Sequence, residues 1–397
     1  MNKKISAAVA SAALVLGATT ANAGIIIPAG EWTVDINGNV NVYASVANYD
    51  DSAAAAGGLS GAQDGNSEDK SQGIGTGLLP AWLGVTATTR QNDLDVSWTI
   101  SMQPNVSENN VMGDSGDVVA WRQAFLTFGD ASWGSVKMGK DLGIFAANAI
   151  LNDMTLLGVG NGGGTSGGNF TNGHIGTGYI YPAWKGQVTY TTPNFNGFTA
   201  KVGITNPNQH VDESVQAIYQ DRFGIEGQLE YAFSAGKAWT SFASYDHSNG
   251  TQEAEAFVMD VGAAVNFGNA GIVAYYYSGE GVGATFLGGN SSFGGASSGV
   301  ASNGNERDSD GGYVQATYVI PSGTKLGVSY GRSTIDLDSS DTAANVQDYN
   351  ELWTVGAYHP LTKHLNLVAE YNMTESKDHG GDTSESDVIS LGAILFF

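Results

Sequence analysis

Few residues of this sequence stand in patterns that could support catalysis or metal binding. The six histidines, at positions 174, 210, 247, 359, 364 and 379, are scattered without the spacing of metal ligands, and there is no cysteine. The sequence also lacks the nucleophile-elbow, zinc-protease and phosphate-loop motifs. We therefore expect that the protein is not an enzyme and that it has no catalytic residues, metal or cofactor.

Two short segments share only part of the pattern of a binding loop. The glycine-rich run at 73–77 is not followed by a helical pattern, as a phosphate-binding loop would be. Asp308-Ser309-Asp310-Gly311 starts like a calcium loop but lacks the distal bidentate Glu of an EF-hand. Both segments are better interpreted as polar surface loops.

The N-terminus has the features of an export signal. Lys3 and Lys4 precede an apolar, alanine-rich stretch at 5–17, and Ala21-Asn22-Ala23 supplies the small-x-small pattern of a cleavage site. The stretch is shorter than the roughly 20 apolar residues that a transmembrane helix needs. We predict a cleaved signal peptide over residues 1–23 and a single domain over residues 24–397. An uncleaved membrane anchor is the alternative.

The charge of the chain limits its partners. Its formal charge is −23, and removal of Lys3 and Lys4 with the signal peptide leaves −25. Such a chain lacks the basic face that nucleic-acid binding requires, and its field attracts cations. Acidic surface loops that serve only solubility are the alternative explanation of the same charge.

Period-two alternation is the clearest structural signal. Between residues 34 and 46, apolar residues and glycine occupy the even positions and mainly polar residues the odd ones. The same alternation recurs at 94–103, 198–205 and 365–374. Neither set of positions could form one stripe of a helix. The segments are about ten residues long, the length of a tilted β-strand that crosses a bilayer.

The connections between these segments alternate between short and long. Short turns are expected at 91–93, 129–132, 193–197, 234–236, 268–270, 321–323 and 359–363, and long polar connections at 50–79, 104–117, 141–183, 206–221, 247–255, 279–310, 336–348 and 375–386. These fifteen connections imply sixteen strands. Tight periplasmic turns and long external loops are typical of outer-membrane barrels. We predict an all-β transmembrane antiparallel β-barrel of 16 strands in the cell outer membrane.

The last strand ends in an aromatic residue. In the segment 389–397, the odd positions are apolar and would face lipid, and the final residue is Phe397. This resembles the C-terminal assembly signal of outer-membrane barrels, which usually ends in Phe. We therefore predict that Phe397 is the assembly signal of this chain.

Two further segments resemble the Gram-negative general porins. Residues 133–140, WGSVKMGK, are similar to the strand that precedes the constriction loop of that family. Residues 188–198, VTYTTPNFNGF, are similar to the strand–turn–strand that follows it. The resemblance implies a homotrimer of sixteen-stranded barrels with the third loop folded into the lumen. It also implies that acidic loop residues face basic residues of the wall across the pore.

On this resemblance we assign five residues to the pore constriction. Lys140 stands where the family has an Arg, and Arg122 resembles a wall Arg of the fourth strand. Arg90 ends the second strand on the lumen parity. Asp141 and Asp153 are the acidic candidates of the third loop. An ordinary solubility residue is the alternative for Asp153.

The sequence departs from the family in two places. The Pro-Glu-Phe-Gly-like turn of the constriction loop is missing, and a glycine-rich tract at 158–168 stands in its place. Lysine at position 140 also supplies a point charge instead of a guanidinium fork. We therefore expect a wider or more mobile constriction than is usual in the family.

These features predict a water-filled channel for passive diffusion of ions and small hydrophilic solutes, surrounded by outer-membrane lipid and lipopolysaccharide. After removal of Lys3 and Lys4, 39 acidic residues stand against 14 basic ones, which favours cations. A substrate-specific channel for a sugar or organic acid is the main alternative. Its lumen candidates, Tyr43, Tyr275, Tyr277 and Tyr313, form no evident track. An outer-membrane enzyme or adhesin and a soluble lectin-like β-sandwich are more distant alternatives.

Overall fold

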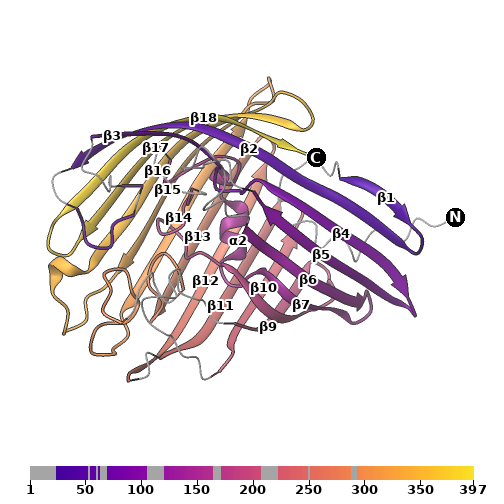
Figure 1. Cartoon of the computed structure of the whole chain (residues 1–397), viewed down its shortest axis with the longest axis horizontal. Helices are drawn as coiled ribbons and strands as arrows, with labels where there is room; N and C mark the ends of the chain where they lie inside the picture. Colours follow the sequence, from indigo (N-terminus) through magenta and orange to yellow (C-terminus); the bar gives the residue numbers. More distant parts are fainter. Residues whose placement is uncertain are drawn as a thin grey trace, which may run out of the picture.

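The strands of this computed structural model form one antiparallel sheet that closes into a barrel (Figure 1). The structure describes residues 24–51, 54–59, 61–62, 69–104, 120–163, 171–206, 222–248, 251–287 and 293–397, so the predicted signal peptide lies outside the described residues. The strands are β1 (Ile25–Ala29), β2 (Trp32–Asp51), β3 (Lys70–Gly75), β4 (Trp82–Gln91), β5 (Leu94–Gln103), β6 (Ala120–Asp130), β7 (Gly134–Leu142), β8 (Trp184–Thr191), β9 (Phe198–Thr205), β10 (Gly224–Phe233), β11 (Gly236–Ser248), β12 (Glu253–Phe267), β13 (Ala270–Glu280), β14 (Asp308–Val319), β15 (Lys325–Ile335), β16 (Gln347–Pro360), β17 (Leu365–Asp378) and β18 (Thr383–Phe396). The helical segments are α2 (Ala147–Asn152), η1 (Met154–Leu157) and η2 (Ala343–Asn345).

The closed ring has sixteen positions, which confirms the strand number expected from the connections. β18 pairs with residues 39–51 of β2 and so closes the ring. β3 and β4 both pair with β2, at its residues 43–48 and 33–39, and together occupy one position. β1 pairs with residues 32–36 of β2, beyond the end of β18, and shares the position of β18. The eighteen strands of the sheet therefore fill sixteen positions.

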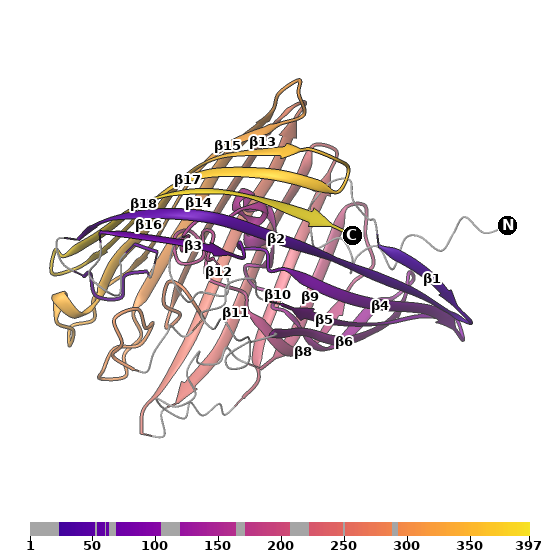
Figure 2. The ribbon, with the colours of Figure 1, turned by 45° about the horizontal axis from the view of Figure 1, so that its top comes forward.

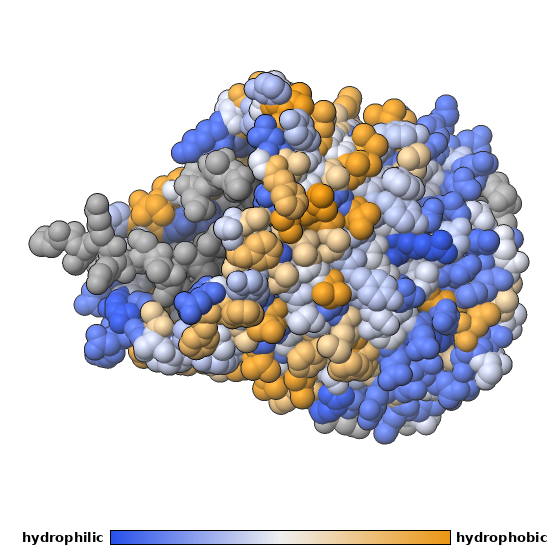
Figure 3. Space-filling view, turned by 180° about the vertical axis from the view of Figure 1, so that it is seen from behind, coloured by the Kyte–Doolittle hydropathy of each residue, from blue (hydrophilic) through white to orange (hydrophobic). Residues whose placement is uncertain are grey.

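The two faces of the strands differ in polarity, as the alternation predicts. In β2, Val40 is 52% exposed on the outside, whereas Asn41 is 1% exposed on the inside. Hydrophobic residues gather across the middle of the outer surface, and hydrophilic residues dominate the end with the long loops (Figure 3). None of the helical segments in the described ranges is long and apolar enough to span a bilayer. An apolar outer belt around a polar interior is the pattern of a membrane-spanning barrel.

Seven tight turns connect the strands from β4 to β17 at the end of the barrel that carries the N-terminus of β2 and the C-terminus of β18, and an eighth joins β1 to β2 there (Figures 1 and 2). Between β4 and β5 only Asn92 and Asp93 intervene, with φ of 48° and 62°. Two successive residues with positive φ are characteristic of the tightest hairpin turn, and Asn and Asp tolerate that conformation better than most residues. The predicted positions of the seven short turns are confirmed.

Two of the predicted long loops are shorter than expected, and a third, 50–79, contains the strand β3, which includes residues 73–75 of the expected glycine-rich loop. β11 and β12 leave only residues 249–252 between them, and β17 and β18 leave only residues 379–382. The expected loops 247–255 and 375–386 are therefore mostly strand. Polar side chains occupy both faces where these strands leave the apolar belt, so the hydrophobic alternation that marks a strand disappears there.

The described residues of the third long connection, 143–163 and 171–183, fold into the barrel. Figure 1 shows α2 inside the ring of strands, and Figure 2 shows it there from a second direction. This confirms the placement that the family resemblance implies. The largest hydrophobic cluster lies where this loop packs against the wall, with Phe145, Ile150 and Ile180 from the loop and Tyr275 and Tyr313 from the wall.

Candidate functional site

A buried ion pair fastens both ends of the third loop to the wall. Glu226 on β10 accepts hydrogen bonds from the backbone N–H groups of Ile144 (2.6 Å) and Phe145 (3.0 Å). Its other oxygen lies 2.6 Å from Nζ of Lys185, the second residue of β8. The two side chains are 3% and 4% exposed, so neither charge is solvated by bulk water. The start of the loop and the strand that follows it are thereby held at one point.

A second carboxylate holds the middle of the loop on nearly the opposite side of the ring. Glu370 on β17 accepts hydrogen bonds from the backbone N–H groups of Val159 (2.8 Å) and Gly160 (2.9 Å). Between the two anchors, Gln315 on β14 accepts from the N–H of Met154 and donates to the carbonyl of Asn152, both at 2.8 Å. The loop thus crosses the lumen and is bound to the wall along its length.

Asp153 fastens the loop to itself. One carboxylate oxygen accepts from the backbone N–H of Thr155 (2.9 Å), and the other accepts from the N–H of His174 (3.2 Å) and the hydroxyl of Tyr179 (2.8 Å). The side chain of Asp153 is 4% exposed. The expectation that this carboxylate faces the pore is therefore wrong, because the returning segment of the loop covers it. Burial also lowers the pKa of His174, which favours its neutral form inside the loop.

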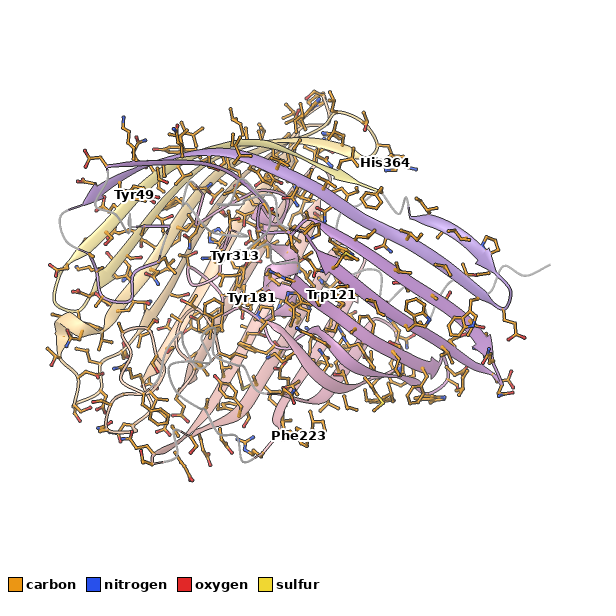
Figure 4. All side chains as sticks on the ribbon, in the orientation of Figure 1. Tyr49, Trp121, Tyr181, Phe223, Tyr313 and His364 are labelled. Atoms are coloured by element: carbon orange, nitrogen blue, oxygen red, sulfur yellow. The ribbon has the colours of Figure 1, made fainter. Side chains whose placement is uncertain are left out.

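The lumen tyrosines do not form a path for solutes. Tyr275, Tyr277 and Tyr313 are buried, and the rings of Tyr275 and Tyr313 lie 5.9 Å apart beneath the third loop. The Tyr313 hydroxyl donates to a carbonyl of α2 at 2.7 Å, and Figure 4 shows Tyr313 inside the barrel. Tyr43, from another part of the wall, donates to a carbonyl of η1 at 2.7 Å. All four tyrosines pack against or near the loop.

Arg90 lies on the lumen face, as predicted, but at the end of the barrel and not at the level of the third loop. It is the residue before the last of β4, next to the short turn. Its guanidinium forms ion pairs with Asp95 (2.8 Å) and Asp130 (2.9 Å), which lie at the same end of β5 and β6. Arg90 therefore belongs to the short-turn mouth of the barrel and not to the constriction. The parity of a residue tells which face of the sheet its side chain is on, but not how far along the barrel axis it lies.

Lys140 points away from the lumen, which corrects its predicted role. It pairs in register with Ala124 of β6, which is exposed on the outer face, and it shares parity with Met138, which is 41% exposed. The odd-numbered residues of β7 face inward, among them Lys137 and Asp141. Lys140 occupies the position of the family's Arg in the sequence motif, but the basic side chain of this strand that faces the lumen is Lys137.

Asp141 and Arg122 do lie at the lumen, close to the ends of the third loop. The Asp141 carboxylate pairs with Lys137 at 2.5 Å and accepts a hydrogen bond from Gln123 at 2.9 Å. Arg122 donates to the hydroxyl of Tyr181 at 3.3 Å in the returning segment of the loop. Figure 4 labels Tyr181 and also Trp121, the residue that precedes Arg122 in β6. These two residues, of the five assigned from the sequence, contact the region that the loop narrows.

Three lysines on the lumen wall were not predicted as site residues. The lysine group consists of Lys137 on β7, Lys201 on β9 and Lys237 on β11. Lys201 lies within electrostatic reach of the other two lysines and of Glu230 and Asp141. Nζ of Lys237 lies 2.8 Å from the side-chain oxygen of Asn148 in α2, so the group adjoins the loop. Lys201 and Lys237 are each the only lysine of their strand, whereas Lys137 shares β7 with Lys140. Lumen parity is the signal that could have identified all three.

Comparisons with known proteins agree with this architecture. A family model described as Gram-negative porin matches residues 10–379. A search of curated proteins finds no match. The solved structures similar to this chain include the outer-membrane channel DcaP of Acinetobacter baumannii, with a TM-score of 0.71, 16% identity and coverage of 94% of this chain and 99% of that one.

Two further solved structures share the fold. The anion-selective porin from Comamonas acidovorans has a TM-score of 0.65 and 16% identity, and the match covers 92% of this chain and 100% of that one. OmpF of Salmonella typhi, in complex with daunomycin, has a TM-score of 0.61 and 16% identity over 94% and 100% of the two chains. Because the family model spans nearly the whole chain, which folds as a closed sixteen-stranded barrel, this outer-membrane protein belongs to the Gram-negative porins.

Proposed function

We propose that this porin is a diffusion pore for ions and small hydrophilic solutes, without an energy source or cofactor. The observation that carries the proposal is a closed barrel with a polar interior, narrowed by a loop that is hydrogen-bonded to the wall from β10 to β17. Such a pore selects solutes by size and by the field at its narrow zone. Transport through it is passive.

We further propose that the pore prefers cations. The acid excess of the chain supports this, and hydrogen bonds from Asn305 and Ser340 hold the pKa of Asp338 below its usual range. This carboxylate of the connection 336–346 therefore stays charged and attracts cations at the long-loop end. The buried Glu226 and Glu370 contribute less, because each is already bound to the loop. The lysine group opposes the preference from inside the lumen.

Ion selectivity tests both parts of this proposal. In a potassium chloride gradient across a planar bilayer, the reversal potential of the wild-type channel should indicate cation preference. Replacing Lys137, Lys201 and Lys237 together with Gln should raise the potassium-to-chloride permeability ratio about two- to fivefold, because roughly 1 kcal/mol of lost repulsion corresponds to about a fivefold change. Lys363→Gln, in an exposed turn, is the control and should change the ratio less. Anion preference of the wild type would refute the cation proposal.

We propose that three copies assemble in lipid and lipopolysaccharide through the low side of the barrel, which is the side where the strands are shortest. β7, β8 and β9 have 9, 8 and 8 residues, whereas β12, β16 and β18 have 15, 14 and 14. On the low side, Trp121 is 58% exposed, and Lys140 carries a charge on the outer face. A lysine there is accommodated better by a protein neighbour or lipid headgroups than by lipid chains.

The assembly is tested by gel migration and mass. An unheated sample should migrate as a high-mass species that shifts on boiling, and light scattering in mild detergent should give a trimer. Lys140→Glu should shift the distribution toward monomer if a neighbouring copy covers this face. A monomeric mass of the wild type would disprove the trimer while leaving the barrel intact.

A further inference from the structure

We propose that a cavity beneath the third loop binds solutes that carry one carboxylate on a compact apolar body. The cavity has a volume of about 160 Å³, several times the roughly 30 Å³ that one water occupies in the liquid. The inference rests on the proposed function and deepens it, because the cavity lies against the loop that narrows the lumen. Apolar pockets with a few polar groups are the usual form of small-molecule sites.

The cavity lies on the short-turn side of the loop. Its wall includes Thr317 near the end of β14, Lys325 at the start of β15 and Phe396 at the end of β18. Its roof is the loop segment 151–157. Gly327 lets the roof approach the wall, because a Cβ there would lie 2.6 Å from the sulfur of Met154.

Lys325 supplies the cavity with a positive charge. Its Nζ lies 4.9 Å from the centre of the Tyr358 ring, and no ion pair of Lys325 is found within the described ranges. The carboxylate of Glu370 lies within electrostatic reach of Lys325, but it is hydrogen-bonded to Tyr358 and to the backbone of Val159 and Gly160. An aromatic face compensates an ammonium group only in part. A carboxylate of the solute would complete its coordination.

The rest of the lining combines apolar side chains with polar groups that already have partners in the protein. The apolar side chains around the cavity are Leu79, Leu151, Met154, Leu156, Leu157 and Phe396. The polar side chains of the lining, Asn152, Asp153, Gln315 and Thr317, are already hydrogen-bonded within the protein. Lys325 is the only cation of the lining, and the one carboxylate of the lining, Asp153, is bonded inside the loop to Thr155, His174 and Tyr179. The cavity therefore matches a monoanion better than a sugar or a doubly charged phosphate, whose polar groups would remain without partners.

Block of the ion current by benzoate tests the proposal. Benzoate added to both sides of a bilayer in 0.1 M potassium chloride should reduce the single-channel conductance with a saturable dependence on concentration. Benzyl alcohol, which lacks the charge, and acetate, which lacks the apolar body, should not do so at the same concentrations. Lys325→Gln should raise the half-blocking concentration of benzoate at least fivefold. Leu156→Asn should raise it too, because it makes the apolar lining polar.

Lys363→Gln is the matched control. It removes one lysine from the same end of the barrel, in the turn between β16 and β17, and does not line the cavity. It should change the half-blocking concentration less than twofold. Equal block of wild type and Lys325→Gln, or equal block by acetate and benzoate, would overturn the proposal. Either result leaves the diffusion pore standing, whereas a protein that forms no conducting channel would refute the proposed function itself.

Discussion

Glu226→Gln should widen the channel, because it removes the charge that holds the third loop against the wall. The substitution leaves the ammonium group of Lys185 buried without its counter-ion. Breaking a buried ion pair in this way costs about 3–5 kcal/mol. The substitution therefore destabilises the docked position of the loop, because the first N–H groups of the loop also donate to this carboxylate. We expect the mean single-channel conductance to rise about 1.5- to threefold with added current noise.

Two variants separate loop docking from a general loss of stability. Glu351→Gln removes a carboxylate that pairs with Arg332 at 3.7 Å on the outer face, away from the loop, and should leave the conductance unchanged. Lys185→Met combined with Glu226→Gln removes both buried charges and should recover a large part of the wild-type behaviour. If Glu226→Gln conducts like the wild type, this ion pair does not control the width of the pore.

The barrel could be predicted from the sequence because its signals are local. Whether a strand such as 34–46 has an apolar and a polar face can be read within a dozen residues. The lengths of the connections then give the number of strands and the end at which each loop lies. The pairing of β18 with β2, 330 or more residues apart in the chain, follows once the number of strands and the closure are accepted.

The site was harder to predict because its contacts join distant residues. Glu226 is 41 residues from Lys185, and Glu370 is 211 residues from Val159. A polar residue on the lumen face has the same sequence signature whether it contacts water or anchors the loop. Asp153 and Arg90 therefore could not be distinguished from pore-facing charges. Lys140 was misplaced because a family motif fixes position along the chain and does not by itself give the direction of a side chain.

Deletion of Phe397 should lower the amount of protein in the outer membrane at least fivefold. The structure places this residue at the seam of the barrel. Its N–H donates to the carbonyl of Gly38 at 3.0 Å, and its carbonyl accepts from the N–H of Gly38 at 2.8 Å. The ring of Phe397 lies against Gly38, where a Cβ would meet it at 2.9 Å. Deletion removes the last two hydrogen bonds of the closing pair together with the predicted assembly signal.

Refolding outside the cell distinguishes these two contributions. Phe397→Tyr keeps both backbone hydrogen bonds and an aromatic ring, and it should assemble at close to the wild-type level. If Phe397 acts mainly as a recognition signal, the deleted chain should refold in detergent with normal heat-modifiable migration while its surface level in cells stays low. If it acts mainly by closing the seam against β2, refolding should fail as well, because each lost hydrogen bond leaves an unpaired group where water is scarce. Unchanged surface levels of the deleted chain would show that neither contribution is needed for assembly.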